Sequence, residues 1–456
     1  MKLFAVASAL LWPFVSRATE AGQTISFTND IAPIFAQKCL ACHGAEKRKG
    51  GYRLDTFEMM LKPGSSKDLS IVPGKPETSK LVQLITAADE DDRMPQKNEP
   101  LSEAEIARIQ RWIREGAEFD GPDTKAALFS MIPPIPQPAA PEGYPRPVPI
   151  TALAFSPDGT ELAAGGYHEI TIWNPLDGRL LRRVHGLAQC TLCLAYQPKG
   201  NLLAAASGTP GKIGEIKLFD AGSGVLAKVL ATSADSMLAV AFSPDGSKLA
   251  AGGSDNAIRL FDVATGKPER IIEQHADWVT SVSFSHSGKL LASASRDKSA
   301  RLYDALTGGV EHSYSGHGDW VLGVAFSADD SQILSCGRDR KVHIWSAGET
   351  NAEKTREISG FEGEVLKLIV TSNAFFTCSS DQSARRHSMD KKHKLMSTFG
   401  GHGDIVYALA LDERFHRLAT GSFDGKVRVW DANVTNGGPL LTFIAAPGLG
   451  KLHRRE

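Results

Sequence analysis

The sequence lacks an excess of charge of either sign. With 51 Lys and Arg against 52 Asp and Glu, its formal net charge is −1 at pH 7, so no basic field attracts nucleic acid or an anionic membrane. It also lacks a nucleophile elbow, an HExxH pair and a phosphate-binding loop. Beyond the amino terminus, no run is apolar enough to cross a bilayer. These absences argue against a nucleic-acid-binding protein and leave no recognisable catalytic constellation.

The first residues have the pattern of an export signal. Lys2 is followed by an apolar stretch from Leu3 to Val15, and small residues precede cleavage after either Ala18 or Ala21. A membrane anchor is the alternative, but spanning needs about 20 apolar residues and this run is shorter. No cysteine lies near the cleavage region, which argues against a lipid anchor. We therefore predict a signal peptide over residues 1–21 and a mature protein in the periplasm or otherwise exported.

The rest of the chain divides into regions of different composition. Residues 23–120 have helical periodicity, residues 148–447 repeat a strand-rich pattern, and residues 448–456 form a tail. Residues 121–147 are predicted to be a semi-rigid linker, since proline-rich segments favour extended conformations. The prolines in and just after this segment include residues 133, 134, 136, 138, 141, 145, 147 and 149.

The strand-rich region contains seven similar units of about 43 residues. Phrases such as "ITALAFSPDG", "MLAVAFSPDG" and "VTSVSFSHSG" recur, and each unit suggests four short strands separated by turns. Equivalent positions are Phe155, Tyr196, Phe242, Phe284, Phe326, Val370 and Leu411. A period of roughly 40 to 45 residues with four strands per unit is typical of propeller blades.

These units resemble WD repeats. "IWN", "LFD", "LYD", "IWS" and "VWD" occupy the aromatic-Asp position of that family. His317 and His402 each follow a glycine, as in its Gly-His pair, whereas His275 follows Gln274. The resemblance implies structural pairs rather than catalytic dyads, here His275–Asp297, His317–Asp339 and His402–Asp424. Two units depart from the pattern: the second has an insertion at 207–214, and the sixth has Arg386-His387 in place of the aromatic-Asp pair.

Cys39-Leu40-Ala41-Cys42-His43 carries the strongest chemical signal. Two thiols three residues apart can form thioethers to the vinyl groups of a haem, and the next His can bind its iron. A zinc site would need a second ligand pair nearby, and none follows. A thioredoxin-like pair would need a βαβ pattern and would not explain His43. We therefore predict one covalent haem c.

The sixth iron ligand is left open among three methionines. Met94 precedes Pro95 in an expected extended loop, from which a thioether can reach a haem face. Met59 and Met60 lie in a short expected helix capped by Asp55, where core packing is the simpler interpretation. Met94 is the favoured axial ligand, and His/Met ligation would suit one-electron transfer.

Two longer helices are expected in this region. Residues 30–41 should form a helix capped near Asn29 with Pro33 in its first turn. Ser102 and Glu105 form a capping box that should open an amphipathic helix ending at Gly116. The apolar face of this second helix, which should pack on the first, comprises Ile106, Ile109, Trp112 and Ile113.

Four segments together resemble the planctomycete-type cytochrome c domain: "DIAPIFAQKCLACHG", "GYRLDTFEMMLK", "IVPGKPETSKLVQLI" and "RMPQKNEPLSEAEIARIQRWIREGA". The resemblance covers nearly all of residues 26–119. It implies that Cys39 and Cys42 bind haem and that His43 and Met94 are the axial ligands. The expected fold is thus a small all-α, class I-like cytochrome c domain joined to an all-β, seven-bladed WD-repeat propeller.

Other cysteines and charges receive simpler interpretations. Cys190 and Cys193 form a second CxxC without a following His, and strand alternation should place them on opposite faces, which favours core packing. Cys336 and Cys378 are expected to be buried free thiols. The acidic run 89–92 could steer a basic redox partner towards the haem, although a solvated loop is the favoured interpretation.

Trp278 and Trp320 occupy equivalent loops of neighbouring repeats, beside Arg296 and Arg338 in adjacent turns. Trp and Arg often anchor protein interfaces, so these four residues are candidates for partner binding; ordinary repeat packing is the alternative. The favoured function is an exported electron carrier that serves a redox partner protein and whose propeller binds a protein. An oxidoreductase with substrate on the propeller, or a haem redox sensor on a binding scaffold, are the alternatives.

Overall fold

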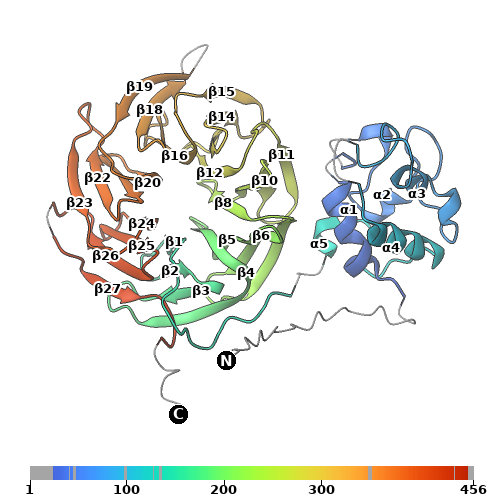
Figure 1. Cartoon of the computed structure of the whole chain (residues 1–456), viewed down its shortest axis with the longest axis horizontal. Coiled ribbons are helices and arrows are strands. Elements are labelled where there is room, and N and C mark those ends of the chain that lie inside the picture. Colours follow the sequence, from blue (N-terminus) through green and yellow to red (C-terminus); the bar gives the residue numbers. More distant parts are fainter. Residues whose placement is uncertain are drawn as a thin grey trace, which may run out of the picture. The chain divides into compact units, whose positions relative to one another are not determined.

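The computed structural model describes residues 24–40, 42–44, 48–96, 100–126, 128–132, 136–347, 352–435 and 437–449. The predicted signal peptide, residues 1–21, and residues 450–456 of the predicted tail lie outside these residues. The chain divides into two compact units, Met1–Ile132 and Pro133–Glu456. In Figure 1 the first unit is built of short helices and the second is a ring of strands. Across the described ranges, no helix has the length and hydropathy needed to span a membrane.

The first unit consists of short helices joined by irregular segments. Its α-helices are α1 (Ala32–Lys38), α2 (Phe57–Met60), α3 (Lys80–Ile85), α4 (Glu103–Arg114) and α5 (Leu128–Met131). A π-helical turn, η1 (Phe27–Ile31), leads directly into α1, and two 3₁₀ turns, η2 (Lys49–Gly51) and η3 (Pro76–Thr78), lie in the connections.

The N-cap of the first helical segment lies three residues before the predicted Asn29. The side chain of Ser26, rather than that of Asn29, accepts the backbone N–H of Asn29 and begins the turn η1. Pro33 does lie in the first turn of α1, as predicted, where its missing N–H removes no helical hydrogen bond. The helix ends at Lys38, so the Cys39–His43 motif lies beyond it.

The cap of helix α2 also differs from the prediction. Thr56 Oγ1 accepts the backbone N–H of Met59 at 3.2 Å. The predicted cap, Asp55, instead accepts two hydrogen bonds from Arg53, at 2.8 and 2.6 Å. Arg53 engages both oxygens of this carboxylate, and the neighbouring Thr56 hydroxyl caps the helix instead.

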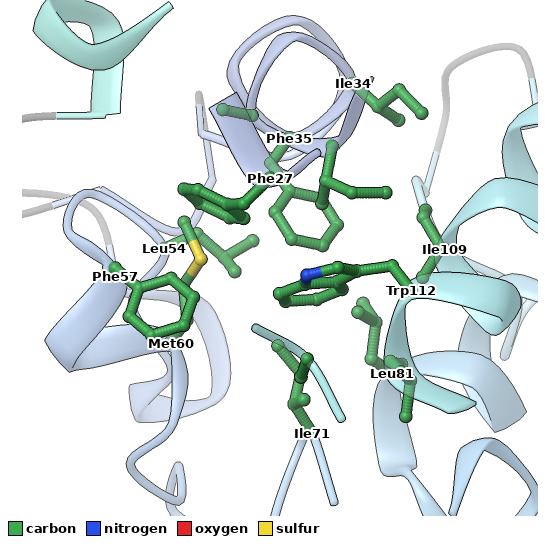
Figure 2. Packing of buried hydrophobic residues seen from close by; sticks show 14 of the residues in the cluster. Phe27, Ile34, Phe35, Leu54, Phe57, Met60, Ile71, Leu81, Ile109 and Trp112 are labelled. Atoms are coloured by element: carbon green, nitrogen blue, oxygen red, sulfur yellow. The ribbon is translucent and has the colours of Figure 1, made fainter. Parts of the chain in front are cut away.

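Helix α4 closes the core of the helical unit. Ser102 and Glu105 form the predicted capping box, and Ile109, Trp112 and Ile113 are fully buried. Figure 2 shows Trp112 beside Phe27 and Phe35 of the first helical segment; the centroids of the two phenyl rings lie 5.5 and 6.1 Å from that of Trp112. The indole N–H donates to Glu118 O at 2.9 Å. The two predicted helices therefore share one aromatic core.

The expected linker, 121–147, makes contacts in both units. Leu128 and Met131 of α5 are buried in the core of the helical unit. Further along, Tyr144 donates a hydrogen bond to the buried carboxylate of Glu169 at 2.5 Å, and its own backbone N–H donates to Pro447 O at 3.1 Å. The domain boundaries stay a prediction.

The second unit is a β-propeller, in which the described residues form six antiparallel sheets. The first sheet has seven strands: β1 (Leu153–Phe155), β2 (Leu162–Gly165), β3 (Tyr167–Trp173), β4 (Leu180–Tyr196), β5 (Leu202–Thr209), β6 (Ile213–Asp220) and β7 (Leu226–Ser233). The next two sheets contain β8 (Met237–Phe242), β9 (Lys248–Gly253), β10 (Ile258–Asp262) and β11 (Pro268–Ile272), then β12 (Val279–Phe284), β13 (Leu290–Ser295), β14 (Ala300–Asp304) and β15 (Val310–Tyr314).

Three further four-stranded sheets complete the described ring in Figure 1. They contain β16 (Val321–Phe326), β17 (Ile333–Gly337), β18 (Val342–Ala347) and β19 (Ala352–Ile358); β20 (Val365–Val370), β21 (Ala374–Ser379), β22 (Ala384–Ser388) and β23 (Leu395–Phe399); and β24 (Val406–Asp412), β25 (Arg417–Ser422), β26 (Lys426–Asp431) and β27 (Leu441–Ile444). In each four-stranded sheet the strands pair in the order in which they follow one another in sequence.

The repeated "SPDG" phrase forms a tight turn between strands, as predicted. Between β1 and β2, the Ser156 hydroxyl donates to Asp158 at 2.6 Å, and that carboxylate accepts the backbone N–H of Thr160 at 3.0 Å. Gly159 has φ +71°, a left-handed conformation that side chains with a Cβ disfavour. The sequence phrase thus fixes where one strand ends and the next begins.

The His-Asp pairs of the repeats are structural, as predicted. His275 and His317 each donate from Nδ1 to the turn carboxylates Asp297 and Asp339 at 2.8 Å. In the last sheet, the nitrogen of His402 lies 3.6 Å from Asp424. The opposite nitrogens contact buried hydroxyls of the same sheets, namely Ser293, Ser335 and Thr420. His275 and His317 are buried and hydrogen-bonded through both nitrogens, whereas His402 is buried and hydrogen-bonded through Nε2. None of the three imidazoles is exposed to solvent as a catalytic base would be.

Candidate functional site

The Cys39–His43 motif forms a tight turn immediately after helix α1. The backbone N–H of Cys39 donates to Phe35 O at 3.0 Å, and those of Cys42 and His43 both donate to Cys39 O at 3.2 and 3.1 Å. The carbonyl of His43 then accepts the N–H of Leu54 at 2.7 Å. Cys39, Cys42 and His43 all line one pocket.

Tyr52 orients the imidazole of His43. His43 Nδ1 donates to the backbone carbonyl of Tyr52 at 3.3 Å, which leaves Nε2 as the nitrogen available to bind a metal. Burial lowers the pKa of His43, so its neutral, ligating form is favoured. The Tyr52 hydroxyl donates to Met60 O at 2.8 Å and fixes this tyrosine to helix α2.

Met94 lies on a loop tied to helix α3. Its backbone N–H donates to Leu84 O at 3.0 Å, and its side chain packs against the apolar core of the helical unit. Met94 lines the same pocket as the Cys39–His43 motif, whereas Met59 and Met60 are not among the lining residues. Met60 is instead fully buried in the core, in agreement with its predicted packing role.

The pocket has a volume of about 590 Å³ and is lined mainly by apolar side chains, within the size range typical of cofactor sites. Its donor set comprises two thiols, one imidazole and one thioether, from Cys39, Cys42, His43 and Met94. These donors fit a haem held by two thioether bonds and two axial ligands. Apolar walls are provided by Tyr52, Leu54, Leu81, Leu84, Ile85 and Leu101.

The pocket is cationic rather than acidic. Lys38, Lys49 and Lys80 line it, and no carboxylate does. The acidic run 89–92 is therefore not part of the pocket wall. Burial raises the pKa of the Cys39 thiol to about 12, with the nearby Cys42 adding to the shift, so Cys39 is protonated in this environment. Sequence reasoning missed Tyr52 and the three lysines; the "GYRLD" segment was the available signal for Tyr52.

The second cysteine pair has a different setting. Cys190 and Cys193 lie on strand β4, and the pairing with β5 shifts register between Thr191 and Cys193. This irregularity interrupts the strict alternation on which the prediction of opposite faces depended. Cys193 is partly buried and packs against a hydrophobic core shared with the neighbouring sheet. Its Sγ lies 3.6 Å from Val240 O. Cys336 and Cys378 are buried free thiols, as predicted.

The four candidate partner-binding residues of the propeller form a stacked row. The guanidinium of Arg296 lies between Trp278 and Trp320, at 4.1 and 3.8 Å from their ring centroids. The guanidinium of Arg338 also lies over Trp320, 4.5 Å from the ring centroid, and its Nε donates to Glu364 at 2.9 Å. The side chains interact through cation–π contacts, and Trp278 is 36% exposed.

Comparisons with known proteins first define the class of the propeller. Residues 142–174, 224–262, 266–304, 308–346 and 393–431 match the family "WD domain, G-beta repeat". The mouse protein Striatin-4 is 32% identical over 105 residues, a match that covers 20% of this chain and 14% of that protein. The second unit is thus a WD-repeat propeller.

The helical unit matches a different and narrower family. Residues 39–98 match the family "Planctomycete cytochrome C", and this range begins at Cys39 and includes His43 and Met94. The matched range is narrower than the 26–119 of the predicted resemblance. Together the two matches confirm that the chain resembles a planctomycete-type cytochrome c domain joined to a WD-repeat propeller.

Proposed function

We propose that this chain is an exported c-type cytochrome that carries one covalent haem c and transfers electrons to or from a partner protein. The observation that carries this proposal is that Cys39, Cys42, His43 and Met94 all line the same pocket. The bound haem would supply a reversible one-electron couple at its iron. The protein would supply the covalent attachment, the two axial ligands and an apolar enclosure that keeps water from the iron.

Three features of the chain support a role in electron transfer. The hydrogen bond from His43 to Tyr52 O fixes the ring orientation that an axial ligand needs. The thioether of Met94 would occupy the second axial position and leave no open position for a substrate. The three pocket lysines place positive charge beside the site, which favours the reduced haem and an acidic partner surface.

We infer further that the propeller has seven blades. Strand β4 pairs with β3 through residues 180–190 and with β5 through residues 190–196. It therefore serves as the outer strand of one blade and the inner strand of the next. If the seven-stranded sheet is counted as two blades that share β4, the six sheets correspond to the seven repeats in the sequence. The proposed role of this ring is to bind a protein through the Trp278–Arg338 row.

The absorption spectrum of the purified, exported protein tests the electron-carrier proposal. We expect a reducible low-spin haem c spectrum, with the weak near-infrared band of a Met-ligated ferric iron. A high-spin, five-coordinate iron would contradict the Met94 assignment and would favour the alternative of an oxidoreductase with an open iron position. Reduction and reoxidation should be reversible without any added substrate.

Capture of partners by the haem-loaded full chain tests the role of the propeller. The expected result is that a protein binds the full chain and that Trp278→Ala weakens this binding. The matched control is Trp173→Phe, which alters a buried tryptophan of the same repeat family. Equal binding by the Trp278→Ala variant and the unaltered chain would contradict the proposed docking row.

A further inference from the structure

The pocket of the helical unit includes a group of polar residues outside the Cys39–His43 motif. Ser65, Ser66 and Ser70 line it from a single segment, and Lys80 lines it from helix α3. Ser70 is buried and Lys80 is half-buried. An occupant of this pocket therefore meets hydroxyl and ammonium groups as well as apolar walls.

Lys80 and Ser70 are neighbours because their backbones belong to one hydrogen-bonded pair of segments. The N–H of Lys80 donates to Leu69 O at 3.3 Å, and the N–H of Leu81 donates to Ser70 O at 2.9 Å. Burial raises the pKa of Tyr52, and a hydrogen bond with Ser70 opposes this shift. The Ser70 hydroxyl is thus engaged with Tyr52, and the charged donor at this end of the pocket is the ammonium group of Lys80.

The ammonium group of Lys80 lacks a counter-ion within the protein. The described part of the chain offers it no ion pair. The other titratable side chains that line the pocket are Cys39, Cys42, His43, Tyr52, Lys38 and Lys49. None of these is a carboxylate, and a partly buried charge without a partner is costly. The pocket is therefore complementary to an occupant that brings its own negative charge.

The other two pocket lysines begin beside the cysteines. Lys38 precedes Cys39 in the sequence, and the backbone N–H of Lys49 donates to Cys42 O at 3.0 Å. In a covalent haem the two vinyl groups that bond to cysteines lie at one edge of the porphyrin, and the two propionates lie at the opposite edge. Lys38 and Lys49 thus belong to the thioether edge, whereas Lys80 approaches the pocket from a separate element.

We propose that the ammonium group of Lys80 binds a propionate of the covalent haem, an inference that rests on the proposed function. A hydrogen bond between an ammonium and a carboxylate is charge-assisted and is about twice as strong as a neutral one. This ion pair would hold the propionate edge beside helix α3, whose Leu81 and Leu84 also line the pocket. Lys80 is then a positioning residue that fixes the cofactor and the charge near its iron without contacting the iron.

The pH dependence of the reduction potential of the haem-loaded full chain tests this ion pair. An adjacent cation lowers the pKa of a carboxyl group by about 1–3 units, so the paired propionate of the unaltered chain should stay ionised and its potential level between about pH 5 and pH 8. Lys80→Met removes the cation and should increase the proton affinity of the propionate at least about tenfold. The potential of this variant should fall as pH rises through the new pKa, because an ionised carboxylate favours ferric iron.

Two matched variants separate the ion pair from a general effect of charge. Lys80→Arg keeps a cation at the same position and should keep the level profile of the unaltered chain. Lys38→Met removes the same charge at the thioether edge; it should lower the potential equally at every pH and leave the profile level. A new titration in Lys38→Met as large as that in Lys80→Met would contradict the assignment to Lys80.

Equal pH profiles in Lys80→Met and the unaltered chain, both with full covalent haem, would overturn the proposal. Lys80→Gln repeats the test with a polar side chain of similar length, and circular dichroism verifies that each variant is folded. Haem staining after denaturing electrophoresis distinguishes the two kinds of failure. An unaltered chain without covalent haem would contradict the proposed function itself, whereas haem-loaded variants with equal profiles would contradict only the role of Lys80.

Discussion

The helical unit and the propeller contain similar reactive residues in different surroundings. Each has a CxxC pair and at least one histidine, and in the helical unit two cysteines, a histidine and a methionine line one pocket. In the propeller, His275 and His317 are hydrogen-bonded on both nitrogens within their own sheets. The comparison teaches that residue type alone does not define a site. A site is defined when several such side chains line the same pocket and a ligand atom, here His43 Nε2, is left without another partner.

The strongest test of this comparison removes each of the two cysteine pairs in turn. Cys39→Ala with Cys42→Ala should abolish covalent haem completely, because no thioether can form. The matched control, Cys190→Ala with Cys193→Ala, should retain full haem content. Haem staining after denaturing electrophoresis measures both. Covalent haem in the first variant, or its loss in the control, would break the distinction between the two pairs.

The next largest effect is expected from the contrast between Met94, which lines the pocket, and Met60, which is buried in the core. Met94→Ala should retain covalent haem but lower the reduction potential by more than about 0.1 V, a fraction of the roughly 0.8 V range that axial ligands span. Met60→Leu, a change within the buried core, should leave the potential nearly unchanged. Potentiometric titration followed by absorbance compares them. Equal potentials in the two variants would show that Met94 does not bind the iron.

Two tryptophans sharpen the contrast between core and surface. Trp112→Ala should lower the free energy of unfolding of the helical unit by about 3–5 kcal/mol, since it removes a fully buried aromatic side chain. Trp278→Ala, which removes a partly exposed cation–π contact, should cost the propeller only about 0.5–1 kcal/mol. Urea unfolding followed by haem absorbance and by circular dichroism separates the two units. Similar losses would contradict the distinct roles.

The smallest expected effect is a pH dependence of propeller stability. Burial lowers the pKa of His402 to about 4, with Arg428 nearby adding to the shift. The unfolded chain, with its ordinary histidine pKa of about 6.5, takes up a proton first. The contribution of this group is therefore complete above about pH 6.5 and decreases as pH falls towards 4.

The urea midpoint of the propeller measured between pH 7 and pH 5 checks this dependence. His402→Gln should reduce the slope of the midpoint against pH. His185→Gln, which changes an exposed imidazole, should leave the slope as it is in the unaltered chain. A steeper slope in His402→Gln would be inconsistent with a neutral, buried His402.

Local signals in the sequence predicted the parts of the molecule that local interactions determine. The Cys39–His43 motif, the Ser102 capping box and the "SPDG" turns each lie within a few residues of their partners, and the structure has the box and the turns as expected. Repeat alignment added the His-Asp pairs, because equivalent positions of a repeat share the same surroundings.

Predictions failed where a competing partner or a distant contact decides. Asp55 does not cap α2 because Arg53 engages its carboxylate, and Ser26 begins the first helical turn before Asn29 can. The hydrogen bond between Tyr144 and Glu169 was not predicted, because it joins residues 25 positions apart and no periodic pattern in the sequence indicates it. The pocket lysines are likewise brought together only by folding.

The intact mass of the protein recovered from the exported fraction tests the central claim most directly. The account predicts one species whose mass equals that of the processed polypeptide plus a single haem, and which stays intact under denaturing conditions. A mass equal to the polypeptide alone, in a host able to attach haem to other c-type cytochromes, would contradict it.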